Sequence, residues 1–339
     1  MHAEFCCCER AKLNLNTRLP LVSFRLFVVV TACVWCFSLP AVAADPVDVA
    51  IVLSEESPAY QAVANSIKAV LAQSPAPGQT VTVLQQSTLL ANPHALSNQI
   101  DLVVAVGVAA MQTVSDSGLH IPVLVTLVPK QAFEKWVNQH QALQDHRYFS
   151  AIYLDQPLSR QLSLIRVALP GRSRIGVILG PTSLDKLKPL QKAVQEQKLH
   201  LDAARIEAAD NLMPTLKNIL ADNDVLLAIP DPLVFNKGNV QSLLLTSYRY
   251  RVPVIGYSQA YVKAGALAGV FSTPVQIGQQ AAELIQHLAN SGTKLLPVPQ
   301  YPKYFGVDVN EQVARSLGIT FEAEGAVYET LRKIVEQEP

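Results

Sequence analysis

The segments DVLLAIPDP (residues 224–232) and VPVIGYSQA (residues 252–260) decide the fold of this chain. Each is an apolar run of strand length that stops at a turn. Neither run alternates apolar with polar residues, so neither has a face reserved for water. Strands that are apolar on both faces are typical of a parallel sheet covered by helices on each side.

Helical segments separate and follow these two runs. Between them, NVQSLLLTSYRYR (residues 239–251) places Val240, Leu243, Leu244 and Tyr248 on one face. After them comes PVQIGQQAAELIQHLANSG (residues 274–292), which opens with a capping box. Thr273 is the cap, Pro274 takes the first helical position, and Gln276 is the other member of the box. Alternating strands and helices predict an α/β fold.

The order of these and other segments resembles the ABC-transporter substrate-binding protein family, which has the type I periplasmic binding fold. The resemblance extends from about Asp48 to Ile319 and includes GALA at Gly265–Ala268. The further matching segments are IDLVVAVGVAA (100–110), IPVLVTLV (121–128), SAIYLDQPLSRQLSLIRVALPG (150–171), RIGVILGP (174–181) and YFGVDVNEQVARSLGI (304–319). No single segment is diagnostic, but their order and spacing together are specific.

Two strand–helix blocks of similar length predict two similar doubly wound parallel-sheet lobes. The resemblance implies that the chain crosses between the lobes three times, through a multi-strand hinge. We therefore expect lobe one to hold residues 45–152 and 272–298, and lobe two to hold 153–271 and 299–325. The tail, residues 326–339, is expected to form an extra amphipathic helix with Val327, Leu331 and Ile334 on its apolar face.

The first 44 residues have the pattern of a secretory signal peptide. Four basic residues precede an apolar run, Leu26–Leu39, which is shorter than the roughly 20 residues of a membrane span. Small residues follow, and we expect cleavage near Ala43 or Ala44. The protein would then be periplasmic. A lipoprotein signal at Cys33 is the alternative, although apolar residues directly after this cysteine argue against it.

Cysteine usage and charge exclude several classes. All five cysteines (Cys6, Cys7, Cys8, Cys33 and Cys36) lie before the expected cleavage point, so the mature chain has no disulfide and no cysteine-based metal site. Removing four basic and two acidic residues from the 27 of each sign leaves 23 and 25, a net charge of −2. Such a chain lacks the basic excess that nucleic-acid binding needs.

The ligand of an open parallel sheet binds at the carboxyl ends of its strands. In this chain those ends carry small and polar residues, and several open helices whose N-termini favour an anionic group. Asp231 or Glu55 could accept an ammonium. The candidate ligand-binding residues are Ser54, Tyr60, Gly107, Thr126, Tyr153, Pro181, Thr182, Asp231 and Tyr257.

Each candidate also has a purely structural interpretation. Ser54, Ser57, Thr182 and Asp155 could be ordinary helix caps. The three tyrosines could be half-buried packing residues, and Gly107 could serve turn geometry.

Enzyme interpretations find little support. Gly256–Ala260 approximates a nucleophile elbow around Ser258, but the only later histidine, His287, lies inside an expected helix. His140 and His146 are six residues apart, which does not suit a metal site on one helix face. No nucleotide-binding motif is present, and no cofactor is expected.

We therefore predict a monomeric solute-binding protein that captures a small ligand, amino-acid-like or a small carboxylate, and delivers it to an ABC permease. The resemblance implies the permease. The chain departs from the family pattern after the first strand (residues 54–60) and at Ser150–Ala151, which leaves ligand and permease open. A sensory protein that signals to a membrane receptor, or a lobe pair without ligand, are the alternatives.

Overall fold

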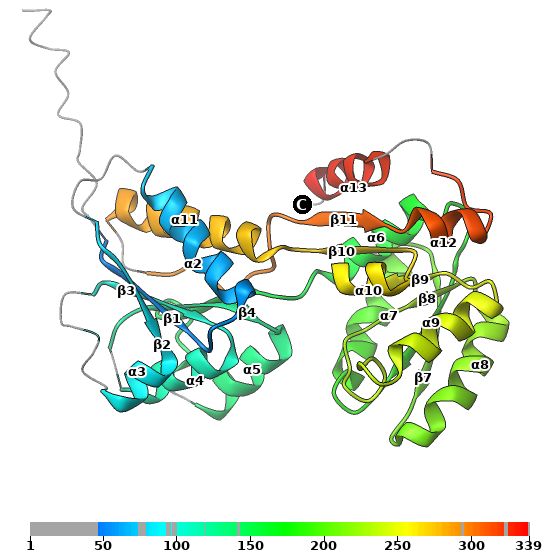
Figure 1. Ribbon diagram of the computed structural model, residues 1–339, viewed down its shortest axis with the longest axis horizontal. Helices are drawn as coiled ribbons and strands as arrows, with labels where there is room; N and C mark the ends of the chain where they lie inside the picture. Colours follow the sequence, from blue (N-terminus) through cyan, green and yellow to red (C-terminus); the bar gives the residue numbers. More distant parts are fainter. Residues whose placement is uncertain are drawn as a thin grey trace, which may run out of the picture. The chain divides into compact units, whose positions relative to one another are not determined.

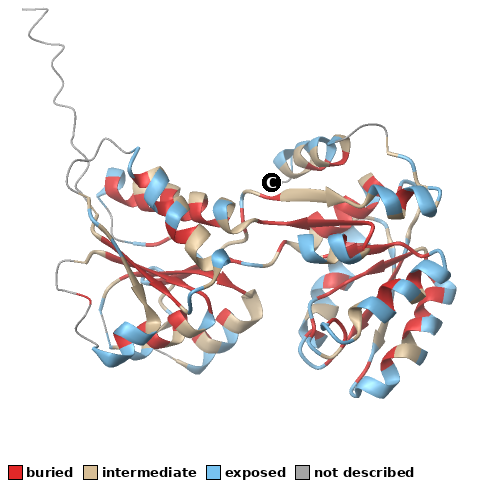
Figure 2. Ribbon diagram, viewed as in Figure 1, coloured by how far each residue is buried: buried red, intermediate tan, exposed pale blue. Residues whose placement is uncertain are grey.

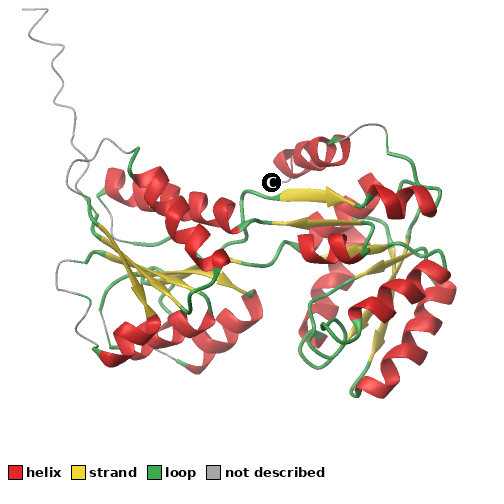
Figure 3. Ribbon diagram, viewed as in Figure 1, coloured by secondary structure: helices red, strands yellow, loops and turns green. Residues whose placement is uncertain are grey.

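The computed structural model describes residues 47–73, 79–92, 96, 100–118, 120–140, 143–292, 295–321 and 325–337. Residues Ala44 to Pro339 form one compact unit, in which the chain builds two β-sheets, each with helices on both faces (Figure 3). The expected signal segment and Cys33 lie outside the described residues.

Sheet A belongs to lobe one. Its strands run in the order β2-β1-β3-β4-β5, and every neighbouring pair is parallel. The bounds are β1 Val49–Leu53, β2 Val81–Gln85, β3 Leu102–Val106, β4 Val123–Val128 and β5 Phe149–Tyr153. The helices of this lobe are α2 Pro58–Leu71, α3 Gln86–Ala91, α4 Val108–Asp116, α5 Lys130–Gln139 and α11 Pro274–Ser291.

Successive residues of β1 enter different cores. Ile51 packs in the core that α2 and α11 cover, whereas Val52 packs in the core that α3, α4 and α5 cover. The buried strands between two helix layers are seen in Figures 1 and 2. Because side chains alternate across a strand, a strand covered on both faces must be apolar throughout. The unbroken apolar run thus predicted the double cover.

Sheet B belongs to lobe two, with the strand order β11-β10-β9-β8-β6-β7. The bounds are β6 Arg174–Leu179, β7 His200–Arg205, β8 Val225–Leu227, β9 Val254–Gly256, β10 Ala268–Phe271 and β11 Gly306–Val309. The helices are α6 Leu158–Ala168, α7 Leu187–Glu196, α8 Leu212–Asp222, α9 Val240–Arg249, α10 Gln259–Ala264, α12 Glu311–Ser316 and α13 Ala326–Gln337, with short 3-10 turns at η3 Leu184–Lys186 and η4 Ala209–Asn211. Neighbours Val177 and Ile178 again enter opposite cores.

The two parallel-sheet lobes are as predicted, and sheet B has in addition one antiparallel strand. β11 is antiparallel to β10, with Gly306 opposite Phe271 and Val309 opposite Ala268. The chain leaves sheet B at the carboxyl end of β10 and enters α11 in lobe one. It returns to that same end, so the next strand must run backwards. Neither β10 nor β11 was predicted from the sequence.

Three segments join the two sheets, as the family resemblance implied. They follow β5, β10 and α11, and the third pairs with β5 through a bridge between Ile152 and Gln300. The exact residue boundaries of the lobes stay a prediction. The expected tail helix is α13, whose Val327 and Leu331 are buried in the core of lobe two beside α6.

Candidate functional site

A cavity of about 770 Å³ lies where the carboxyl ends of both sheets meet the three joining segments. Its walls come from the chain after β4, β5, β6, β8, β9 and β10, from the starts of the helices that follow, and from the third joining segment at Tyr301. The lining residues with polar side chains are Lys130, Gln131, Glu134, Asp155, Gln156, Gln161, Asp185, Lys186, Tyr257, Ser258, Gln259, Ser272, Thr273 and Tyr301. Apolar residues such as Leu154, Leu158, Ile229 and Phe271 line the rest.

Lys130 supplies a cation on the lobe-one wall. Its Nζ lies 5.2 Å from the ring centroid of Tyr301 and 5.8 Å from that of Tyr153, and 3.6 Å from a Glu134 carboxylate oxygen. Burial works to lower the pKa of Lys130, but Tyr301 and Glu134 outweigh it and raise the pKa above its ordinary value. Lys130 therefore stays an ammonium at neutral pH.

The register of β4 places this lysine. Leu127 has φ +53°, and the pairing of β4 with β5 shifts between Thr126 and Val128. The strand ends at Val128, as the apolar run predicted, and Pro129 is the N-cap of α5. Pro129, Lys130 and Gln131 all line the cavity as a result.

Asp155 links the two lobes at the cavity wall. Its carboxylate accepts a hydrogen bond from the backbone N–H of Lys130 and lies 3.5 Å from Nζ of Lys186, which belongs to η3 of lobe two. The side chains of this pair are only 14% and 18% exposed, so solvent screens them less than a surface pair. Gln131 also donates to the backbone oxygen of Thr182 across the lobes.

A buried hydrogen-bond network joins the three crossover segments. Gln156 donates to Ser272 Oγ at 2.8 Å, and Ser272 in turn donates to the backbone oxygen of Tyr304. Arg160 donates to Gln156 and to the backbone oxygen of Pro302, and its guanidinium lies 4.5 Å from the ring centroid of Phe305. These hydrogen bonds hold the three crossovers to one another.

Of the predicted site residues, Tyr257 lines the cavity. Its ring contacts Phe235 and Tyr261. Burial, and to a smaller extent the hydrogen bond with Tyr261, raises the pKa of the Tyr257 hydroxyl, which therefore stays neutral. Tyr153 is 5% exposed and lies behind the wall, in contact with Tyr301.

Ser54, Tyr60 and Gly107 lie together beside the cavity residue Ala59. The Ser54 hydroxyl donates to the Val106 oxygen and accepts from the Ala110 N–H, so it caps α4. Gly107 has φ +90°, and a Cβ there would lie 2.6 Å from Ser54 Oγ. The structure thus gives Gly107 the role of turn geometry. Ser57 caps α2 by accepting from the Tyr60 N–H.

Thr126, Pro181, Thr182 and Asp231 are not among the residues that line this cavity. Thr126 is fully buried, and Pro181 and Thr182 are exposed. Asp231 is 3% exposed; it accepts hydrogen bonds from the Ser183 N–H and hydroxyl, both at 2.9 Å, and from the Leu233 N–H at 2.8 Å. The structure therefore places Asp231 as a buried acceptor for its own lobe rather than as a group facing the cavity.

The residues considered for enzyme or metal chemistry have other surroundings. Ser258 begins α10, whereas His287 lies in the interior of α11, which packs on sheet A. His140 stacks on Trp136 and bonds to its backbone oxygen. Among the residues that the structure describes, no three His, Cys, Asp or Glu side chains form a group suited to a metal.

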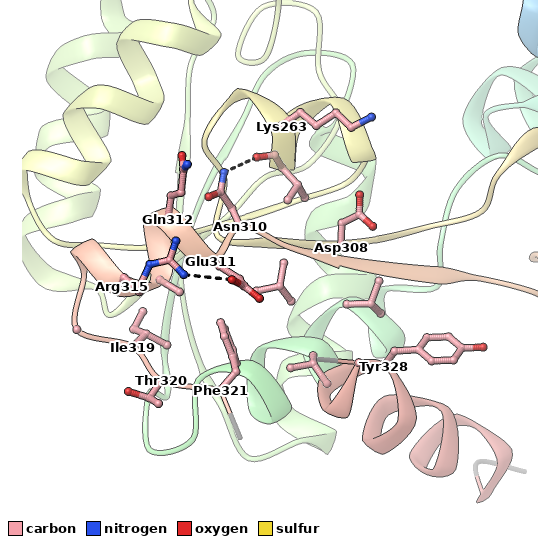
Figure 4. A pocket seen from close by; sticks show the side chains of 17 residues that line it. Lys263, Asp308, Asn310, Glu311, Gln312, Arg315, Ile319, Thr320, Phe321 and Tyr328 are labelled. Carbon is pink, nitrogen blue, oxygen red and sulfur yellow. Dashed lines mark hydrogen bonds and ion pairs between the residues drawn. The ribbon is translucent and has the colours of Figure 1, made fainter. Parts of the chain in front are cut away.

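A second cavity, of about 950 Å³, lies entirely in lobe two, beside β11, α12 and α13 (Figure 4). Three of its polar residues have partners within the lobe: Arg315 pairs with Glu311 at 3.1 Å, and Asn310 donates to the Val262 oxygen and caps α12. Though larger, it draws on only one lobe and does not lie at the carboxyl ends of the parallel strands. We therefore place the candidate ligand site in the first cavity.

Two α/β lobes around a shared polar cavity define a class of solute-binding proteins. The sequence model described as ABC transporter substrate binding protein matches residues 64–330, and the chain belongs to this family. Family members act outside the cytoplasm and bind small molecules rather than transform them. Among the described residues, no helix is both long enough and apolar enough to cross a bilayer.

Solved structures show the same fold. A ligand-free, open substrate-binding protein with adhesive properties from Clostridium difficile has a TM-score of 0.64 at 18% identity, covering 81% of this chain and 96% of its own. An ABC domain in complex with L-Trp from Streptococcus pneumonia has a TM-score of 0.55 at 16% identity, covering 84% and 98%. A conserved domain protein from Vibrio cholerae has a TM-score of 0.55 at 21% identity, with the same coverage. No curated protein matches the chain.

Proposed function

We propose that this protein is a periplasmic solute receptor that captures a small zwitterionic or anionic ligand between its lobes and delivers it to an ABC permease. The protein would act as a monomer, without a cofactor and without catalysis. The observation that supports it most is the cavity that both lobes and all three crossovers line. A ligand held there contacts both lobes, so its binding favours the arrangement that buries it.

The charges of the cavity support the ligand class. Lys130 and Lys186 bring ammonium groups from opposite lobes. The first turn of α6 also lies at the cavity, which Leu158 lines, and its N-cap, Pro157, makes no side-chain cap hydrogen bond, so the positive end of the helix dipole faces the ligand site. These groups suit a carboxylate, whereas Asp155 and Glu134 suit an ammonium.

The aromatic residues that line the cavity are Tyr257, Phe271 and Tyr301, and the absence of a tryptophan among them supports an amino acid or small carboxylate over a sugar. Sugar sites cover a pyranose ring with aromatic faces, and the lone tryptophan in the described chain, Trp136, bonds to Ser115 and does not line the cavity. The L-Trp complex among the structural neighbours agrees with an amino-acid ligand. A ribose transporter from Conexibacter woesei shares the fold with a TM-score of 0.50, so sugars belong in the test.

A thermal-shift screen of amino acids, small carboxylates and sugars on the chain from Asp45 tests the proposal. A ligand at a hundred times its Kd adds about 2.7 kcal/mol of stability, which is readily measured. We expect shifts from amino acids or carboxylates. A response to sugars alone would refute the ligand class, and no response from any class would refute solute capture.

Delivery and location have separate tests. The first residue of the periplasmic protein should be Ala44 or Asp45, and a start at lipidated Cys33 would replace the free receptor with an anchored one. Neighbouring permease and ATPase genes would support delivery. A neighbouring sensor gene without them would favour signalling to a membrane receptor.

A further inference from the structure

The edge of sheet B opposite the cavity carries a cluster of cations. We define the basic edge as Arg172, Arg174, Lys198, Arg249 and Arg251, which lie at or just before the starts of β6, β7 and β9, Arg174 being the first residue of β6 and Arg249 the last of α9. Because neighbouring strands of a parallel sheet begin at the same side, these turns lie along one edge. The register agrees, since Arg174 is opposite His200, Ile175 is opposite Val225 and Leu226 is opposite Val254.

These charges are close together and only partly neutralised. The four strands β9-β8-β6-β7 are adjacent, so at about 4.8 Å per strand the basic edge spans roughly 15 Å. Arg174 pairs with Asp224 at 3.1 Å, and Glu196 pairs with Lys192 at 3.8 Å. Two further acids of this region, Asp202 and Asp222, form no ion pair in the described chain, and Asp202 accepts a hydrogen bond from Asn223. They stand against four cations, Arg172, Lys198, Arg249 and Arg251.

The excess of positive charge belongs to this edge and not to the whole chain, whose formal net charge is zero. The equivalent edge of sheet A, where β1, β3 and β5 begin, carries Asp48, Asp101 and Asp145. Its arginine, Arg147, is paired with Asp145 at 2.9 Å. The basic edge is therefore a local feature of lobe two.

Exposed apolar and aromatic side chains accompany the cations. Tyr248 and Tyr250 alternate with Arg249 and Arg251, and these tyrosines are 46% and 42% exposed. Leu245, one turn earlier on α9, is 48% exposed. The four side chains of Tyr248–Arg251 make no hydrogen bond, ion pair or ring contact with another described residue. They are free to meet a partner.

The backbone holds two of these cations in a conformation that favours glycine. Lys198 and Arg251 both have φ +57°, and each follows the end of a helix. The residue after each one donates its N–H back to a carbonyl of that helix: Leu199 N–H to Val194 O, and Val252 N–H to Ser247 O, both at 3.0 Å. At the ends of α4, α11 and α12 the left-handed residue is glycine instead: Gly118, Gly292 and Gly318. Two helix ends on the basic edge thus carry a cation at a left-handed position where glycine, which α4, α11 and α12 use, would be less strained.

We propose that the basic edge docks on the anionic phospholipid headgroups of a membrane surface. Each Lys or Arg near an anionic surface raises the binding affinity by roughly fivefold, and tyrosine side chains are favoured at the level of the headgroups. Since the edge lies opposite the cavity, a docked protein presents its cavity to the solution. This inference concerns lobe two alone and does not depend on the identity of the solute.

Co-sedimentation of the chain from Asp45 with lipid vesicles tests the proposal. We expect binding to phosphatidylcholine vesicles that contain phosphatidylglycerol, loss of binding at high salt, and none to pure phosphatidylcholine. Arg249→Gln with Arg251→Gln should weaken binding at least tenfold. Lys68→Gln with Lys135→Gln removes the same charge from exposed sites of lobe one and should leave binding within twofold.

A second variant separates docking from folding. Lys198→Gly with Arg251→Gly removes two cations and also the backbone strain of two non-glycine residues in the left-handed conformation. The Tm of this variant should therefore equal or exceed that of the wild type, while its vesicle binding falls at least tenfold. Binding that is equal with and without phosphatidylglycerol would overturn the proposal. So would an equal loss in the lobe-one control, or unchanged binding in the glycine variant.

Discussion

Asp231→Asn distinguishes a structural carboxylate from a ligand-binding one. Asp231 is 3% exposed, and its two oxygens accept three hydrogen bonds from Ser183 and Leu233. Asparagine keeps the shape but has one oxygen. If that oxygen serves Ser183, the new NH₂ group faces the N–H of Leu233, and a buried donor loses its acceptor.

The cost follows from this exchange. An unsatisfied buried donor costs about 1–3 kcal/mol, and the bonds that remain lose their charge assistance, so we expect a loss of about 2–4 kcal/mol. For a chain of this size that corresponds to a fall in Tm of roughly 3–7 °C. The Kd of the solute should stay within about twofold, because Asp231 does not line the cavity.

Urea unfolding and calorimetric titration of the same protein provide the two readouts. Asp155→Asn, at the cavity wall, is the comparison, and it should weaken binding. If Asp231→Asn leaves the free energy of unfolding unchanged while weakening binding tenfold, the carboxylate contacts the ligand, and our assignment of it to the lobe interior is refuted.

Three further predictions concern single residues. Gly107→Ala should lower the free energy of unfolding by about 2–4 kcal/mol, because Gly107 has φ +90° and the added Cβ would lie 2.6 Å from Ser54 Oγ and 2.9 Å from the Tyr60 ring; an unchanged urea midpoint would contradict this. Burial acts to raise the pKa of Glu283, but hydrogen bonds from Tyr304 and Gln279 and the charge of Lys303 outweigh it and lower the pKa below its ordinary value of 4.5. The carboxylate therefore stabilises the fold at pH values above the pKa of the unfolded chain, and this stabilisation is lost as the pH falls through the pKa of the folded protein. Glu283→Gln should flatten the profile of unfolding free energy against pH between about pH 5 and pH 3. A variant profile as steep as that of the wild type would count against this prediction. Ser258→Ala should leave solute affinity within a few-fold and any esterase rate at background, whereas a serine-dependent rate would restore the nucleophile elbow.

The fold could be predicted where its signal is local. An unbroken apolar run such as that of β8 requires cover on both faces, and Thr273 with Gln276 forms the expected capping box at the start of α11. β10 and β11 were missed because glycines interrupt the apolar run around β10, and because β11 depends on the return of a distant segment to the sheet.

The site could be predicted only in part. Strand ends gave Tyr257, but Lys130 depends on the irregularity at Leu127, which no sequence pattern marks. Tyr301 reaches Lys130 from 171 residues away, on a crossover without regular structure. Asp231 has the sequence context of a ligand group, and only the positions of Ser183 and Leu233 show that its acceptors are already occupied.

Calorimetric titration of the tightest amino acid or carboxylate into the wild type, Lys130→Met and Lys135→Met tests the account most directly. Both lysines lie on α5, but only Lys130 lines the cavity between the lobes. A hydrogen bond to a charged group contributes about 1.5–3 kcal/mol, so Lys130→Met should weaken binding by tenfold or more, and Lys135→Met by less than twofold. Equal affinity in all three proteins would contradict capture in this cavity.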